Sequence, residues 1–154
     1  IMSRVARSAR VASRQRVETI SADKAIGAAE TGELYLIAHA NDATALTITL
    51  PPMQDGAYFK FIWKSDMTHD SATVVFNSNT NTEGDFAGVI IEATDDGADG
   101  AVATERAGSE DVLTIGSSND TFTGSYLECY CDGLKWYWTG VIVAAAAGNA
   151  VFST

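Results

Sequence analysis

Cysteine, proline and long apolar runs are scarce in this chain. Its 154 residues include two cysteines and two prolines, and no apolar run approaches the ~18 residues of a membrane span. Cys129 and Cys131 lie two residues apart on one predicted strand, a poor geometry for bonding each other, so we interpret both as small buried apolar side chains. We therefore expect neither a disulfide nor membrane contact, and a chain of this length buries enough surface, roughly 70%, to fold as one domain.

Positive charge is also scarce, and half of it lies at one end. The chain has ten basic and twenty acidic residues, a net charge of −10. Five of the ten are arginines within the first sixteen residues, where no acidic residue occurs, so residues 1–16 carry +5 and the remainder −15. We predict an extended basic arm over residues 1–16 and a single β domain over 17–154, because such asymmetry is typical of a segment that lies on another molecule.

Valines recur every six residues in the arm, which suits one face of an extended strand better than a helix. Such an arm would add as a strand to a neighbour's sheet edge while its arginines meet acidic groups. A frayed, solvated terminus is the alternative. The residues predicted to bind a partner are Arg4, Val5, Arg7, Arg10, Val11, Arg14, Arg16 and Val17.

The partner of the arm is more readily a protein than a nucleic acid. Arginine contacts to phosphate dominate nucleic-acid affinity, which makes a basic arm a candidate for that role. However, a body with a charge of −15 would be repelled by a polyanion, and its strands show no groove of basic and aromatic residues. We therefore predict a protein partner with acidic patches, and no nucleic acid.

Short alternating segments dominate the rest of the chain. Residues 44–50 and 57–64 alternate most clearly, and a helical turn at 28–31 is stopped by Gly32. About nine or ten short strands between turn residues predict an all-β fold, a compact antiparallel β-sandwich or small barrel with an extended N-terminal arm. Residues 93–111, rich in acidic residues, are predicted as an exposed loop. The other predicted strands are 17–21, 33–38, 73–76, 88–92, 112–115, 141–147 and 150–154.

Two aromatic-rich segments meet at residues 132–133, an Asp-Gly pair that is the strongest short-range signal of a hairpin. A two-residue type I′ turn there pairs Cys131 with Leu134 and Cys129 with Trp136. One face of the hairpin then carries the cysteines, leucines and tryptophans, and the other places Lys135 opposite Tyr130. The predicted exposed aromatic residues are Tyr126, Tyr130 and Tyr137.

Candidate zinc ligands fail on spacing. His39, His69, Cys129 and Cys131 have the composition of a two-His, two-Cys site. Cys-x-Cys on a strand lacks the two-to-four-residue spacing that lets both sulfurs reach one tetrahedral ion. We therefore expect no metal at these residues.

Other catalytic and ligand-binding patterns fail in the same way. Residues 69–71 contain the letters of a His-Asp-Ser triad, but neighbours on extended chain point in opposite directions, so we predict a polar turn. Acidic residues between 95 and 111 break the EF-hand ligand order, and no glycine-rich phosphate loop is present. We expect no catalytic residue, no cofactor and no enzymatic activity.

The order of turn and strand motifs over residues 17–154 resembles compact β modules of tailed-phage virions. The motifs are AAETG at 28–32, ALTITLP at 45–51, an aromatic strand after Gly56, DFAG at 85–88, and the segment from Gly124 to Trp136. Such modules occur in head decoration (capsid cement) proteins and in trimeric fibre or appendage domains. The chain and its 93–111 segment are larger than the simplest decoration proteins of this kind.

Resemblance to cement proteins implies a homotrimer on the outer capsid surface, whose N-terminal segment pairs with the major capsid protein. The basic arm favours this role, with the arginines making charge-assisted contacts and the valines providing apolar anchors. The alternative is a trimeric fibre or appendage domain that binds a host receptor or glycan through its exposed tyrosines. A carbohydrate-active enzyme on a β-sandwich is the third hypothesis.

Overall fold

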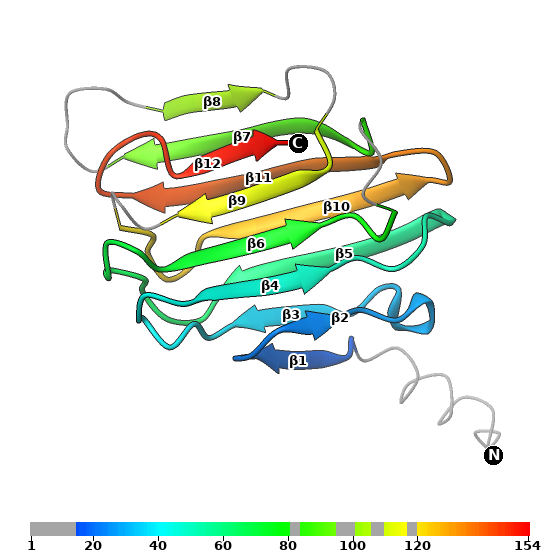
Figure 1. The fold of residues 1–154 in the computed structure, drawn as a ribbon, viewed down its shortest axis with the longest axis horizontal. Coiled ribbons are helices and arrows are strands. Elements are labelled where there is room, and N and C mark those ends of the chain that lie inside the picture. The colour runs from blue at the N-terminus through cyan, green and yellow to red at the C-terminus, as the bar shows by residue number, and fades with distance from the viewer. Residues whose placement is uncertain (1–14, 81–83, 95–100, 106–109, 117–119) are drawn as a thin grey trace, which may run out of the picture.

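Alternating side chains place the strands of this chain in two packed layers (Figure 1). The computed structural model describes residues 15–80, 84–94, 101–105, 110–116 and 120–154. In this part of the chain the one helical element is a short 3-10 turn at Ala28–Glu30, at the predicted position. It contains no helix long and apolar enough to cross a bilayer. The all-β sandwich predicted from the sequence is confirmed.

The larger layer is a seven-stranded sheet with the order β1-β3-β5-β10-β11-β7-β8. It mixes pairings: β1, β3 and β5 run parallel, as do β11 and β7, whereas the other neighbours are antiparallel. The sandwich is therefore mixed, not antiparallel as predicted. The strands are β1 (Val17–Ile20), β3 (Leu34–Ile37), β5 (Asp55–Trp63), β10 (Tyr126–Asp132), β11 (Trp136–Ala144), β7 (Phe86–Thr94) and β8 (Ala101–Glu105).

The smaller layer is a five-stranded sheet with the order β12-β9-β6-β4-β2. Its three central strands, β9, β6 and β4, bury every second side chain, as Leu46 and Ile48 do in β4, which is the period expected of strands with one face on a core. The strands are β12 (Ala150–Ser153), β9 (Val112–Gly116), β6 (Thr73–Asn77), β4 (Ala45–Thr49) and β2 (Lys24–Ala25).

Aromatic rings fill the space between the two sheets. Phe76 of the smaller sheet packs edge-on against Phe61, with ring centroids 4.8 Å apart, and against Trp138 at 5.1 Å. Trp138 also meets Phe86 at 5.3 Å. Large buried rings in tilted and edge-to-face contacts contribute strongly to stability, because each removes roughly 150–250 Å² from water. Cys129 is buried in this core as predicted, and its burial raises the pKa of the thiol well above the usual value.

The central hairpin forms, but its register differs from the prediction by two residues. Cys131 pairs with Trp136 and Cys129 with Trp138, so a three-residue connection, 133–135, replaces the two-residue turn at 132–133. The carboxylate of Asp132 causes this, because it accepts hydrogen bonds from the backbone N–H groups of both Leu134 and Lys135 at 2.8 Å. Because the shift is an even number, the tryptophans and cysteines still face the core.

The predicted acidic loop over residues 93–111 is wrong for the parts that the structure describes. Ala93 and Thr94 complete β7, residues 101–105 form β8 beside it, and Glu110 and Asp111 are buried. The backbone at Glu110 and Asp111 bonds to Phe86 and to Ser153, which ties this segment to both sheets. Residues 95–100 and 106–109 lie outside the described residues. The composition of this segment indicates a loop, but tertiary hydrogen bonds determine the structure of its described parts.

Candidate functional site

The outer side of the larger sheet exposes an apolar and aromatic surface, which we call the tyrosine face. Four of its side chains are more than two fifths exposed: Tyr130 (46%), Tyr137 (44%), Val89 (41%) and Ile91 (41%). A solvent-facing sheet surface is normally polar, so exposed apolar residues on adjacent strands mark a surface that contacts something. The face comprises Tyr58, Lys60, Ile62, Val89, Ile91, Tyr126, Glu128, Tyr130, Tyr137, Thr139, Val141 and Val143.

The predicted aromatic residues Tyr126, Tyr130 and Tyr137 all belong to this face, and their rings are engaged with neighbours. Tyr130 stacks on Tyr58 of β5 with ring centroids 4.8 Å apart. The ammonium group of Lys60 lies 5.1 Å from the centre of the Tyr126 ring. The hydroxyl of Tyr137 donates to Asp132 at 2.9 Å. These contacts fix the side chains and cover part of two of the ring surfaces that a sugar would need.

A single ion pair neutralises the middle of the tyrosine face. Lys60 Nζ lies 2.8 Å from Glu128 Oε1, across the β5–β10 pairing. Their hydrogen bond raises the pKa of Lys60 and lowers the pKa of Glu128, whose carboxylate also accepts from Tyr130 at 3.0 Å. Lys135, predicted to lie opposite Tyr130, does not, because Tyr130 pairs with Tyr137. The sequence could not indicate the ion pair, because β5 and β10 are about 65 residues apart and pair only in the fold.

Most of the predicted arm lies outside the described residues. Arg4, Val5, Arg7, Arg10, Val11 and Arg14 all belong to residues 1–14, of which nothing is described. The end of the arm is described: the backbone N–H of Leu34 donates to the carbonyl of Arg16 at 2.9 Å, and the Arg16 guanidinium lies 3.3 Å from Glu33. Val17, the last predicted anchor, is 56% exposed in β1, an edge strand. The arm therefore joins the domain at an edge of the larger sheet.

Three carboxylates gather beside this junction and form a candidate cation site. One oxygen from each of Glu18, Glu30 and Glu33 lies within 4.8 Å of the others. Lys24 already places its ammonium group 2.9 Å from both Glu18 and Glu30. Burial opposes the charge of Lys24, but the hydrogen bonds to Glu30 and Glu18 raise its pKa overall. The chain thus supplies its own cation here, and the cluster holds the open side of the sandwich together.

Buried Tyr35 completes this cluster on the core side. Its ring stacks on Phe61 with centroids 5.5 Å apart, and the Lys24 ammonium lies 5.5 Å from its centre. Burial, followed by the nearby charge of Glu30, raises the pKa of the Tyr35 phenol far above its usual value. A phenol held protonated in this way serves the packing of the edge and offers no base for chemistry.

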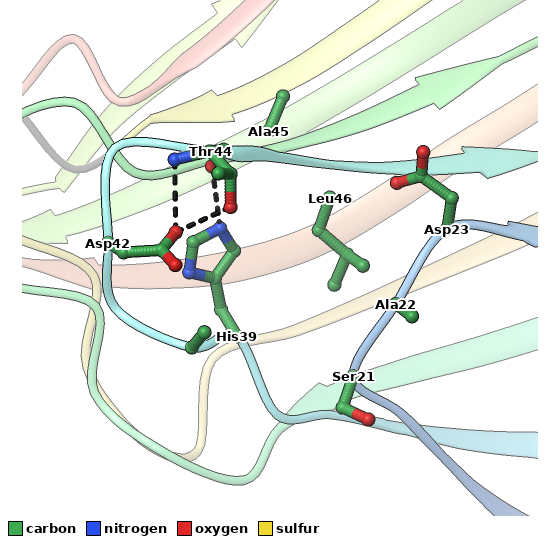
Figure 2. Close-up of a pocket in the computed structure, with 9 residues that line it drawn as sticks. Ser21, Ala22, Asp23, His39, Asp42, Thr44, Ala45 and Leu46 are labelled. Carbon is green, nitrogen blue, oxygen red and sulfur yellow. Dashed lines mark hydrogen bonds between the residues drawn. The ribbon is translucent and has the colours of Figure 1, made fainter.

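An open pocket of about 530 Å³ lies between the β1–β2 connection and the loop before β4 (Figure 2). His39 uses both ring nitrogens inside it: Nδ1 accepts from the backbone N–H of Asn41, and Nε2 donates to the carbonyl of Thr44, each at 2.9 Å. Asp42 accepts from Thr44, which lowers the pKa of Asp42. Asp23 accepts from the backbone of Thr47 at 2.8 Å. The polar groups of the pocket therefore hold two loops in place.

The candidate metal ligands and triad residues named from the sequence have structural roles in the fold. His69 Nδ1 accepts from the backbone N–H of Ser71 at 3.2 Å, which gives the predicted polar turn. The two cysteines lie in the core, while His39 is committed to its own loop. The sequence did not indicate that Val89 and Ile91 belong to the tyrosine face, because the parallel β7–β11 pairing that brings them beside Thr139 and Val141 has no local signature.

No protein-family model, curated protein or solved structure matches this chain, so its function has to be inferred from the sequence and the geometry alone.

Proposed function

We propose that this chain is a structural protein of a tailed-phage virion that decorates the outer surface of the capsid. In this proposal it acts without catalysis as a homotrimer, and its basic arm binds the major capsid protein. The observation that carries the proposal is the separation of charge, with +5 on residues 1–16 and −15 on the remainder. Neither nucleic acid nor a membrane enters the proposal.

The junction between arm and domain supports this role. The arm ends at β1, an edge strand whose outer side has no partner strand among the described residues. A segment leaving from an edge can continue as an added strand on a neighbouring sheet, where backbone hydrogen bonds give affinity and side chains give specificity. Arg16 already shows the pairing that the other arginines would make, because it contacts Glu33 while its own side chain stays 79% exposed.

Three arms on one trimer would bridge several capsid subunits. Each arm alone is short and would bind weakly, but linked binding sites raise the overall affinity by about 10²–10⁴ without any new contact. A β domain that folds around its own aromatic core would remain intact while the arms attach. This combination suits a protein that reinforces a shell from outside.

The alternative, a trimeric fibre or appendage domain for a host receptor or glycan, finds less support in the geometry. It would use Tyr126, Tyr130 and Tyr137 as stacking surfaces. Tyr130 already stacks on Tyr58, and Lys60 lies over Tyr126. A flat face with its rings engaged in this way suits another protein surface better than a sugar.

The decisive experiment uses heads assembled from the capsid genes of the genome that encodes this chain. Full-length protein is expected to co-sediment with these heads and to occupy many equivalent positions in particle images. A variant with the arm arginines Arg4, Arg7, Arg10 and Arg14 changed to Gln should bind at least about 100-fold more weakly, because every arm of the trimer is weakened together. The matched control changes Lys64 and Lys135 of the domain to Gln and should bind normally.

Two outcomes would contradict the proposal. Normal head binding by the arginine variant would remove the role of the arm. Binding confined to the tail, with adhesion to host cells, would favour the fibre alternative.

A further inference from the structure

We infer that the tyrosine face is the surface through which copies of this chain associate with one another. The inference rests on the proposed function only for the number of copies, three, and its physical basis is independent of any capsid. Three observations carry it: the apolar character of the face, its neutral charge and its extent.

Apolar exposure in the described residues is concentrated on this face. Val89 and Ile91 of β7 lie beside Thr139 and Val141 of β11, and Tyr137, further along β11, pairs with Tyr130 of β10. Val17, in the edge strand β1, is a further exposed apolar residue on this side of the sheet, and Lys60 and Glu128 lie between it and Val89. Exposed apolar and aromatic residues gathered on one face mark an interaction site when they exceed the few that a monomer leaves in water.

The charge of the face points to a second copy as the occupant. Two copies of a domain carrying −15 repel one another wherever their acidic surfaces meet. Away from the strand ends, the described outward-facing residues of the larger sheet include one cation and one anion, Lys60 and Glu128, which are paired with each other at 2.8 Å. A face whose central charges are paired internally can approach the surface of a neighbouring copy without net repulsion, and in a ring of three each copy presents this face to the next.

The extent of the sheet is sufficient for a stable contact. Seven strands about 4.8 Å apart, with lengths up to roughly 30 Å, give a face on the order of 600–800 Å². A standard protein interface buries about 800 Å² on each partner. Exposed tyrosines are residues that protein interfaces favour, since they bury large areas at low cost in side-chain entropy.

The test is sedimentation of the full chain over a range of concentrations, with two disrupting variants and one matched control. Ile91→Glu and Val89→Glu each place a carboxylate on the face, and we expect each to raise the dissociation constant at least tenfold. Val151→Glu makes the same change at an equally exposed position, 48%, on the outer side of β12 in the other sheet. It should leave the dissociation constant unchanged. Near-ultraviolet circular dichroism of the buried tryptophans verifies that each variant is folded.

Several outcomes would overturn the inference. A full chain that remains monomeric at every concentration excludes the contact, and equal weakening by Val151→Glu excludes the assignment to this face. If deleting residues 1–14 abolishes association while Ile91→Glu does not, the arm joins the copies instead. If a monomer begins to associate only after that deletion, the arm covers its own face.

Failure of this inference and failure of the proposed function can be told apart. An assembly that depends on Ile91 but does not bind heads upholds the inference and refutes the decoration role. A monomer that binds heads refutes the inference and upholds the decoration role.

Discussion

The outer surfaces of the two sheets differ sharply, although their inner surfaces are alike. Both inner surfaces are apolar, and both sheets alternate side chains with the same period. The outer side of the larger sheet carries the tyrosine face. The outer side of the smaller sheet carries mostly threonines, small residues and valines, which we call the threonine face. Its members include Thr47, Thr49, Thr73, Val75, Val112, Thr114 and Val151.

This difference shows that burial against the core does not explain which residues face outward on the two sheets. Threonine favours strands and leaves a hydroxyl for water, so the threonine face is suited to solvent. The tyrosine face has stacked rings and a neutralised ion pair in place of scattered hydroxyls and charges. The outer side of the smaller sheet is thus suited to water, and the outer side of the larger sheet is suited to contact with another molecule.

The largest expected effect on stability comes from disrupting the β7–β11 pairing, which supports the tyrosine face. Gly88 has φ +150°, and a Cβ added there would lie 2.0 Å from the carbonyl oxygen of Trp138. Gly88→Ala must therefore separate β7 from β11, and we expect a loss of about 4 kcal/mol or more in the free energy of unfolding. Urea denaturation measures it.

The control for this change is Gly32→Ala. Gly32 also has positive φ, +85°, but no atom lies within 4 Å of the added Cβ. We expect a cost of about 1–2 kcal/mol, from backbone strain alone. Equal losses at the two glycines would show that the close approach of β7 and β11 is not decisive.

A smaller effect is expected where the two layers are tied together. Glu92 of β7 is fully buried and accepts hydrogen bonds from the backbone N–H groups of Gly148, Asn149 and Ala150, at the start of β12. Glu92→Ala leaves these donors without that acceptor, at a cost of about 3 kcal/mol. Hydrogen exchange should accelerate at these amides first. Glu92→Gln, which keeps one acceptor oxygen, should recover part of the loss; no recovery would mean that packing, and not hydrogen bonding, is the role of Glu92.

The ion pair of the tyrosine face should give a still smaller, pH-dependent effect. Glu128 has a lowered pKa in the folded protein, first through its hydrogen bond with Lys60. Its contribution is therefore present above the unfolded-state pKa, about 4.3, and is lost as the pH falls through the folded-state pKa. Glu128→Gln should cost about 0.5–1 kcal/mol at pH 7 and nothing at strongly acidic pH. Urea denaturation across this range measures the difference, and a cost that persists in strong acid would contradict the assignment.

The smallest effect on stability is expected from two opposite substitutions, one on each face, that replace a methyl group by a hydroxyl or a hydroxyl by a methyl group. Val89→Thr on the tyrosine face and Thr114→Val on the threonine face have opposite chemistry and similar volume. Each should change the free energy of unfolding by less than about 0.5 kcal/mol. Sedimentation should show several-fold weaker self-association for Val89→Thr and no gain for Thr114→Val. A gain for Thr114→Val would mean that both faces can associate and that the comparison between them fails.

The sequence predicted the layers well because their signal is local. Alternation of apolar residues located most strands, and the parity of the central hairpin followed from it, so Trp136, Trp138 and Cys129 were correctly placed on the core side. The register was wrong because an Asp-Gly pair is compatible with more than one loop length. The side chain of Asp132, by accepting from Leu134 and Lys135, selects the longer one.

The composition of the tyrosine face was predicted only in part, because most of it arises from pairing between distant strands. Its three hairpin tyrosines could be named from alternation. Tyr58 and Lys60 join them through the β5–β10 pairing, and Val89 and Ile91 through the parallel β7–β11 pairing. Neither pairing joins strands connected by a short turn, so no local sequence motif predicts it. The strand β8 was missed for the same reason, since it forms against the edge of β7.

The two thiols of β10 can report motions of the sandwich through their rates of reaction. Cys129 is fully buried, whereas Cys131 is slightly exposed beside the hairpin loop and accepts a hydrogen bond from the backbone of Gly133 at 3.3 Å. Only an exposed thiolate reacts with an alkylating reagent. The rate of alkylation of Cys131 should therefore report how often the hairpin loop opens. The rate of alkylation of Cys129 should report the much rarer separation of the two sheets.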